Sequence, residues 1–147
     1  MTEAMLLTLK LVIVLGIHRS GAISHIEYQG GSANLSDSNP DHDYYLKLAE
    51  RSLERKQPIG ISVSGDEIVE VVRADADTVL NVSEDQDKGR LKIWFQAHDG
   101  TFSLQYNHPD FQRISRLLKI SKDDKKSVWF VARKPLLDIQ DAVFLEP

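Results

Sequence analysis

Residues 31–61 read GSANLSDSNPDHDYYLKLAERSLERKQPIGI, and residues 100–130 read GTFSLQYNHPDFQRISRLLKISKDDKKSVWF. The two stretches align without a gap when the sequence is shifted by 69 positions. Seven of the 31 aligned pairs are identical, whereas average composition gives roughly two matches by chance. These pairs are Gly31/Gly100, Leu35/Leu104, Pro40/Pro109, Asp41/Asp110, Leu48/Leu117, Ser52/Ser121 and Lys56/Lys125. We therefore expect an internal duplication, and a repeat of this length largely decides the architecture.

Each copy is predicted to contain two strands, a helix and two further strands. The first hairpin joins residues 23–28 to 32–36 in copy one, and residues 91–97 to 101–106 in copy two, through turns that contain glycine. The helix prediction depends on apolar and small residues that recur with helical spacing at matching positions. They are Tyr45, Leu48, Ala49 and Ser52 in copy one, and Ile114, Leu117, Leu118 and Ser121 in copy two. Alternating strands from Ile59 and Val128 then lead into the second hairpins.

The predicted fold class is α+β, with two ββαββ copies about an approximate twofold axis, antiparallel sheet and one helix per copy. The copies span about residues 12–74 and 77–145, within a single domain of residues 1–147. One copy alone, at about 70 residues, is of marginal size for independent folding, so we expect the copies to share a core. Residues 83–89 are expected to form a solvated linker between strands.

The N-terminal stretch Met5–Ile17 is strongly apolar. It is too short to cross a bilayer and contains Lys10. Basic residues before the apolar run and a clear cleavage site after it, both typical of a signal peptide, are lacking. Apolar residues at the odd positions from 7 to 17 instead favour a largely buried strand, and a targeting segment is the alternative.

Composition narrows the function classes. Apolar residues make up 41% and charged residues 27% of the chain, which favours a globular protein over a disordered one. The chain has no cysteine, which excludes disulfides, thiolate metal sites and a cysteine nucleophile and is compatible with a cytoplasmic protein. The net charge of −4 disfavours a nucleic-acid partner. We predict no cofactor and no membrane association.

Candidate metal or catalytic residues are sparse. Asp37, Asp41, His42 and Asp43 come closest to a metal cluster, but a loop before a helix collects such residues for capping. The five histidines show neither the His-x-His pattern nor the i, i+4 spacing of a helical zinc site. No Ser-His-Asp signature is present, and Glu50 and Glu54 lie beside arginines on an expected solvated helix face. We therefore predict no metal site and no catalytic residue, and the sequence leaves catalysis open.

The run Val14–Gly21 resembles the phosphosulfate-binding loop of sulfotransferases, in which a strand enters a G-x-H-R-S-G-T-S turn before a helix. The resemblance implies anion binding by the backbone amides, Arg19 and hydroxyl groups. It covers eight residues and ends at Ala22-Ile23, where the family has its hydroxyl pair. The favoured interpretation is a strand, a turn and a second strand.

Two asymmetries between the copies point to binding by copy two. Its predicted helix is basic, with Arg113, Arg116 and Lys119 among its residues, whereas the helix of copy one is nearer to neutral. Copy two also holds both tryptophans. By alternation, Trp94 and Trp129 lie on the sheet face opposite the apolar core residues. An indole on that face needs to be covered by the other copy, by the N-terminal strand, or by a ligand or partner. The predicted binding residues are Trp94, Trp129, Arg113, Arg116 and Lys119.

The leading hypothesis is a non-enzymatic interaction module that engages a protein partner through the second repeat. The alternative is a small-molecule-binding protein or small enzyme with a site in the cleft between the two repeats. A protein partner and a small molecule therefore both stay open.

Overall fold

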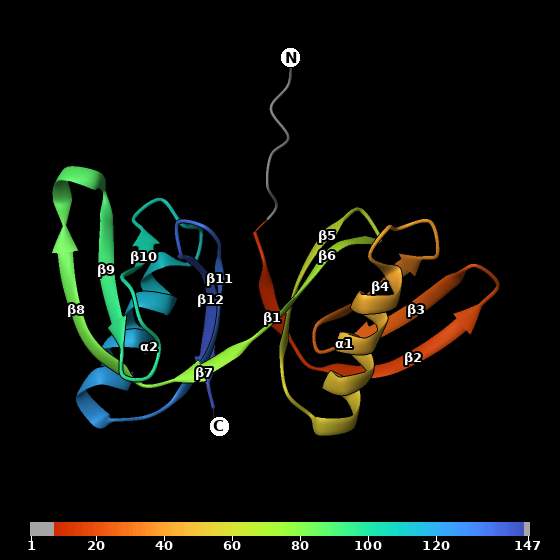
Figure 1. Ribbon diagram of the computed structural model, residues 1–147, viewed down its shortest axis with the longest axis horizontal. Helices are drawn as coiled ribbons and strands as arrows, with labels where there is room; N and C mark the ends of the chain where they lie inside the picture. The colour runs from red at the N-terminus through yellow and green to blue at the C-terminus, as the bar shows by residue number, and fades with distance from the viewer. Residues whose placement is uncertain (1–7, 146–147) are drawn as a thin grey trace, which may run out of the picture. The chain divides into compact units, whose positions relative to one another are not determined.

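The computed structural model describes residues 8–145 and divides into two compact units, Met1–Arg73 and Ala74–Pro147 (Figure 1). Each unit contains four strands, one long helix and two further strands. The elements of unit 1 are β1 (Lys10–Val12), β2 (Val14–Ser20), β3 (Ile23–Tyr28), β4 (Gly31–Ser36), α1 (His42–Arg55), β5 (Ile59–Ser64) and β6 (Glu67–Arg73). Those of unit 2 are β7 (Asp75–Asp77), β8 (Val79–Asp85), a short 3₁₀ turn (Gln86–Lys88), β9 (Arg90–Phe95), β10 (Phe102–Gln105), α2 (Phe111–Asp124), β11 (Val128–Arg133) and β12 (Asp138–Phe144).

Both units order their strands in the same way. The sheet of unit 1 runs β1-β5-β6-β4-β3-β2, and that of unit 2 runs β7-β11-β12-β10-β9-β8, so every strand has a counterpart at the same place. The α+β class is confirmed, and each unit places four strands before its helix and two after it. The two helices also correspond, because α1 and α2 are offset by 69 residues along their whole length.

The prediction of purely antiparallel sheet is wrong. Strand β4 runs parallel to β6, and β10 runs parallel to β12. The physical reason lies in the connection through the helix, which leads from β4 to a strand that is not its neighbour. The hairpin partner of that strand then folds back between the two, as β6 does between β4 and β5. A mixed sheet of six strands results in each unit.

Each unit has its own cluster of buried apolar side chains. The cluster of unit 2 joins residues of α2, such as Ile114 and Leu118, to Leu91, Ile93 and Phe130 of the sheet. The cluster of unit 1 is built in the same way from α1 and β1–β6. Each unit therefore has a core of its own.

Local predictions were correct for most elements. Strand β3 has the predicted bounds, and the predicted helical stripes are buried except for half-buried Tyr45. Residues 83–85 instead belong to β8, and 86–88 form the 3₁₀ turn, so the predicted linker is only partly correct. Asp41 and Asp110 stand at the helix N-caps but make no side-chain capping hydrogen bond.

The apolar N-terminal stretch forms strand as predicted from Lys10 onward, whereas residues 1–7 lie outside the described residues. Its predicted alternation is wrong. The stretch divides at Ile13 into β1 and β2, and Leu15 occupies a bulge in the pairing of β2 with β3. Val12 and Val14, at even positions, are buried, and Leu15 in the bulge is 58% exposed. Among residues 8–145, no helix is long and apolar enough to cross a membrane.

A buried serine fixes the end of each helix to the strand at the edge of the sheet. The Ser121 hydroxyl accepts a hydrogen bond from the backbone N–H of Val79 (3.0 Å) and donates one to the carbonyl of Lys126 (2.6 Å). Ser52 makes the same two bonds in unit 1, to Val14 and Gln57. These bonds satisfy backbone groups near the helix end, where intrahelical partners run out. The identity of Ser52 and Ser121 in the repeat therefore has a structural cause.

We expect Ser121→Ala to lower the unfolding free energy of unit 2 by about 1–3 kcal/mol, because it leaves a buried N–H and a carbonyl without their partner. Both tryptophans belong to unit 2, so tryptophan fluorescence during urea unfolding follows that unit. Ser83→Ala, at an exposed position of β8, is the control and should change stability by less than about 0.5 kcal/mol. Equal stability of the two variants would contradict the role of the buried hydroxyl.

Candidate functional site

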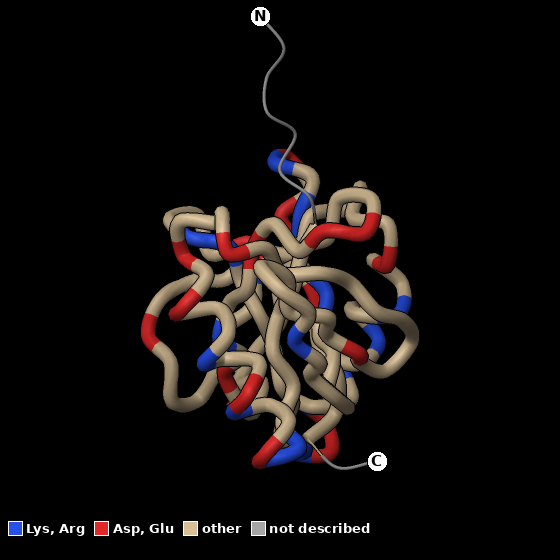
Figure 2. The backbone as a smooth tube through the Cα atoms, turned by 90° about the vertical axis from the view of Figure 1, so that its right-hand side faces the viewer, with Lys and Arg blue, Asp and Glu red and all other residues tan. Residues whose placement is uncertain are grey.

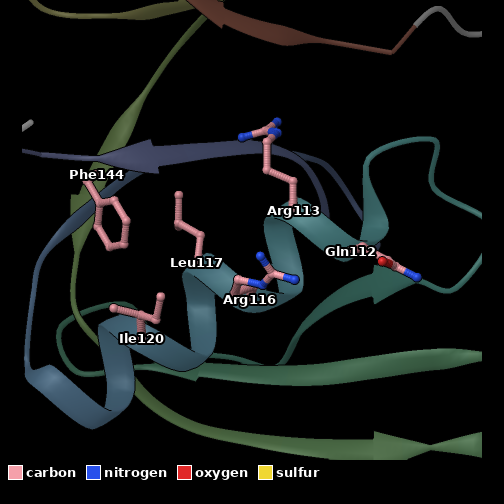
Figure 3. A pocket seen from close by; sticks show the side chains of 6 residues that line it. All are labelled: Gln112, Arg113, Arg116, Leu117, Ile120 and Phe144. Atoms are coloured by element: carbon pink, nitrogen blue, oxygen red, sulfur yellow. The ribbon is translucent and has the colours of Figure 1, made fainter.

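The outward face of α2 carries two adjoining open hollows. One has a volume of about 420 Å³ and is lined by Gln112, Arg113, Arg116, Leu117, Ile120 and Phe144. The other has a volume of about 330 Å³ and is lined by Gln112, Ser115, Arg116, Lys119, Ile120 and Asp123. Figure 3 shows Leu117 and Ile120 of α2 beside the ring of Phe144 from β12. We refer to the residues that line these two hollows as the α2 face.

Helical spacing explains why the α2 face is partly apolar. Ile114, Leu117 and Leu118 point into the core of unit 2, and Ile120 follows at the border of that stripe, where it stays half-buried. Phe144 ends β12 and packs against the edge of the same core. The border of the core therefore comes to the surface between α2 and β12.

The three predicted basic residues all line the α2 face, but Arg113 differs from the other two. Its guanidinium donates to a carboxylate oxygen of Asp141 (2.5 Å) and to the carbonyl of Ala142 (3.0 Å), and it lies 3.7 Å from Asp110. Arg113 thus fastens α2 to β12. Arg116 and Lys119 are exposed and make no hydrogen bond or ion pair with the described part of the chain. Their charge is available to a ligand.

Unit 1 provides an internal comparison, because its elements match those of unit 2. The position of Ile120 is taken by Arg51, and that of Phe144 by Arg73, which pairs with Ile59 as Phe144 pairs with Val128. Lys119 corresponds to Glu50. The same fold therefore forms with charged residues at both apolar positions, and folding does not require Ile120 or Phe144 to be apolar.

The structure separates the two predicted tryptophans from the basic residues. Trp94 alternates with Leu91, Ile93 and Phe95, and Trp129 stands between Val128 and Phe130, all of which belong to the core that α2 covers. Both indoles are half-buried on the opposite face of the sheet, as alternation predicted. Strands β9 and β11 are three positions apart in the sheet, about 14 Å at the usual strand spacing. The five predicted residues thus form two separate surfaces.

Ile120 and Phe144 were missed at the sequence level. The shift of 69 residues already pairs Ile120 with Arg51, which is a detectable change from charged to apolar. Phe144 corresponds to Arg73 at a shift of 71, because the turn between β11 and β12 is two residues longer than the turn between β5 and β6. A gapless alignment therefore hides the second apolar change.

The titratable groups with shifted pKa values lie outside the α2 face. The clearest is Asp77, whose carboxylate accepts hydrogen bonds from the backbone N–H groups of Thr78, Ala97 and His98 and from Nδ1 of His98 (2.6 Å). Burial by itself would raise the pKa of Asp77, but the hydrogen bonds from His98 and the backbone hold it below its ordinary value of 3.8. The saturated carboxylate connects β7 to the turn after β9, which is a structural role.

The acidic loop before α1 makes internal contacts. Asp37 accepts a hydrogen bond from Arg19 (2.6 Å) and lies 3.0 Å from Nε2 of His42, whose Nδ1 is 3.0 Å from Asp43. Within residues 8–145, no three His, Asp or Glu side chains are arranged to hold a metal ion. Acidic and basic residues are interspersed along the backbone (Figure 2).

The run that resembles a phosphosulfate-binding loop is a β-hairpin. Strand β2 turns at Gly21, with φ at 63°, directly into β3. The helix that would direct its N-terminus at a phosphate is replaced by a strand. The guanidinium of Arg19 is held by Ser24 and Asp37. The strand–turn–strand interpretation is confirmed.

We expect Arg113→Ala to lower the unfolding free energy by about 2 kcal/mol, because it removes two charged hydrogen bonds between α2 and β12. Arg116→Ala, on the same helix, should cost less than about 0.5 kcal/mol. Urea unfolding followed by tryptophan fluorescence measures both. A larger loss in Arg116→Ala than in Arg113→Ala would show that the roles are reversed.

The lowered pKa of Asp77 predicts a pH-dependent effect of Asp77→Asn. Its carboxylate stabilises the fold above the pKa of the unfolded chain, and this contribution is lost as the pH falls through the lower folded-state pKa. The variant should therefore be less stable than the wild type at pH 7, and the gap should narrow toward about pH 3. Thermal unfolding across this range tests it, with the exposed Asp99→Asn as control. A gap that is constant with pH would refute the assignment.

Comparison with protein-family models, with curated proteins and with solved structures found no match to this chain. Function is therefore inferred from the chemistry of the α2 face.

Proposed function

We propose that the chain is an internal duplication in which unit 2 has become a module that binds a protein partner through the α2 face. The shared strand order and the matching serine bridges support the duplication. The single observation that carries the binding role is the replacement of two arginines of unit 1 by Ile120 and Phe144 in unit 2. Apolar side chains at half-buried border positions that carry charged residues in unit 1 favour an interface.

The composition of the α2 face suits a protein partner. Leu117, Ile120 and Phe144 provide an apolar centre, and the arginines and Lys119 stand around it. Protein interfaces combine an apolar centre with a polar rim, and arginine and aromatic residues are enriched in them. The hollows are open, which favours a broad contact surface over an enclosed small-molecule site.

The tryptophan surface stays a separate prediction of binding, because it lies on the opposite face of the sheet. The site between the two repeats likewise stays a prediction. We propose the α2 face as the binding site because the two units differ there at positions where the same fold tolerates either a charged or an apolar residue.

The test is capture of partners from a cell extract of the source organism by immobilised protein. A variant with the residues of unit 1, Lys119→Glu/Ile120→Arg/Phe144→Arg, should lose the captured partner and keep its fold, because unit 1 carries these residues in the same architecture. Circular dichroism and thermal unfolding check the fold.

Two matched variants serve as controls. Lys47→Glu reverses a charge on the helix of unit 1, at the counterpart of Arg116, and Trp94→Ala removes an indole from the opposite face of unit 2. Both should retain the partner. Loss of capture in Trp94→Ala alone, with full capture by the triple variant, would move the site to the tryptophan surface and refute the proposal.

A further inference from the structure

We infer that the partner presents a short acidic segment with one bulky apolar side chain, which enters the hollow between α2 and the end of β12. This inference rests on the proposed function and names the chemistry of the partner. Its basis is the combination of an apolar floor with two cations that lack a counter-ion in the described chain.

The apolar floor of the hollow favours one bulky apolar side chain on the partner, which we call the anchor. Leu117, Ile120 and Phe144 meet in a hollow of about 420 Å³, toward the lower end of the range for ligand sites, roughly 300–1,000 Å³. The lining residues of α2 run from Gln112 to Ile120, which spans about 12 Å along the helix axis. A contact of this length accommodates a few residues of a partner. One leucine, phenylalanine or tryptophan side chain of the partner can enter the hollow and bury its own apolar surface there.

The positive charges of the α2 face favour acidic residues beside the apolar anchor of the partner. Arg116 lines both hollows and Lys119 lines the second, so a cation stands on the side of the apolar floor away from β12. The charge of Arg113 is already directed at Asp141. Asp123 also lines the second hollow and opposes the cations at that end. Carboxylates of the partner are therefore expected opposite Arg116 and Lys119, before the helix reaches Asp123.

The matching surface of unit 1 lacks the residues that favour an acidic segment with an apolar anchor. At the matching positions, Lys47 remains basic, but Glu50 replaces Lys119 and arginines replace the two apolar residues. That arrangement has no apolar anchor point, because charged side chains stand at every position that is apolar in the floor of the hollow except that of Leu117. Selectivity for an acidic segment with an apolar anchor should therefore belong to unit 2 alone.

A nucleic acid or an anionic membrane would also be attracted to the cations. A phosphate backbone gains little from the apolar floor. A flat bilayer surface would contact the whole basic side of α2, including Lys122, which lies outside the two hollows. The observations favour a peptide because the apolar and cationic residues converge within one short hollow.

The experiment is selection from a library of random short peptides on the full chain, with the Lys119→Glu/Ile120→Arg/Phe144→Arg variant used for counter-selection. Enriched peptides should share acidic residues beside one bulky apolar residue. A synthetic peptide of the enriched sequence should bind the wild type and lose at least roughly tenfold in affinity, about 1.4 kcal/mol, toward Arg116→Glu. Replacement of the peptide's apolar residue by alanine should weaken binding to the wild type by a similar factor. The affinity of the peptide should also fall as the salt concentration rises.

Other outcomes overturn the inference. These are enriched peptides without acidic residues, equal enrichment on the triple variant, or tighter binding of a single-stranded oligonucleotide or of phosphatidylserine vesicles than of any acidic peptide. Such results leave the proposed function standing if extract capture still depends on the α2 face. If capture does not depend on it, the proposed function itself fails, whatever the peptides show.

Discussion

A single buried hydroxyl in each unit determines where the helix ends and how it lies on the sheet. Ser121 joins the last turn of α2 to the first residue of β8, and Ser52 does the same for α1 and β2. With its end fastened, each helix presents one apolar stripe to the sheet, and the opposite residues face outward. The apolar stripe therefore turns Arg116 and Lys119 outward, and the serine bonds hold the end of the helix that carries them.

The two units share the apolar pattern of their cores and differ at the border of the core. Leucines at matching positions, Leu35/Leu104 and Leu48/Leu117, are buried in both units, each in the core of its own unit. The border of the core carries arginines in unit 1 and Ile120 and Phe144 in unit 2. The charged residues of unit 2 also fall into two groups. Asp77 and Arg113 make hydrogen bonds to other residues of the chain, whereas Arg116 and Lys119 make none with the described residues.

Much of the local structure could be predicted from the sequence. The period of the apolar residues identified both helices and the inward side of β9 and β11, which placed Trp94 and Trp129 on the outer face. That the arginines of α2 lie on the other face of the sheet from the tryptophans could not be predicted, because it depends on which face the helix covers. The N-terminal alternation failed where a break at Ile13 and a bulge at Leu15 interrupt the strand without any mark in the composition.

The sequence by itself predicted a repeat, and it determined where the helices and hairpins lie and which side chains most elements turn inward. These properties follow from backbone geometry and hydrophobic spacing within a few residues. Only the tertiary structure decided that β6 and β12 insert beside β4 and β10, that each unit has its own core, and that Phe144 meets Ile120. These outcomes depend on hydrogen bonds and packing between distant segments, and turns of unequal length shift the register between the two copies, so that no single spacing in the sequence encodes them.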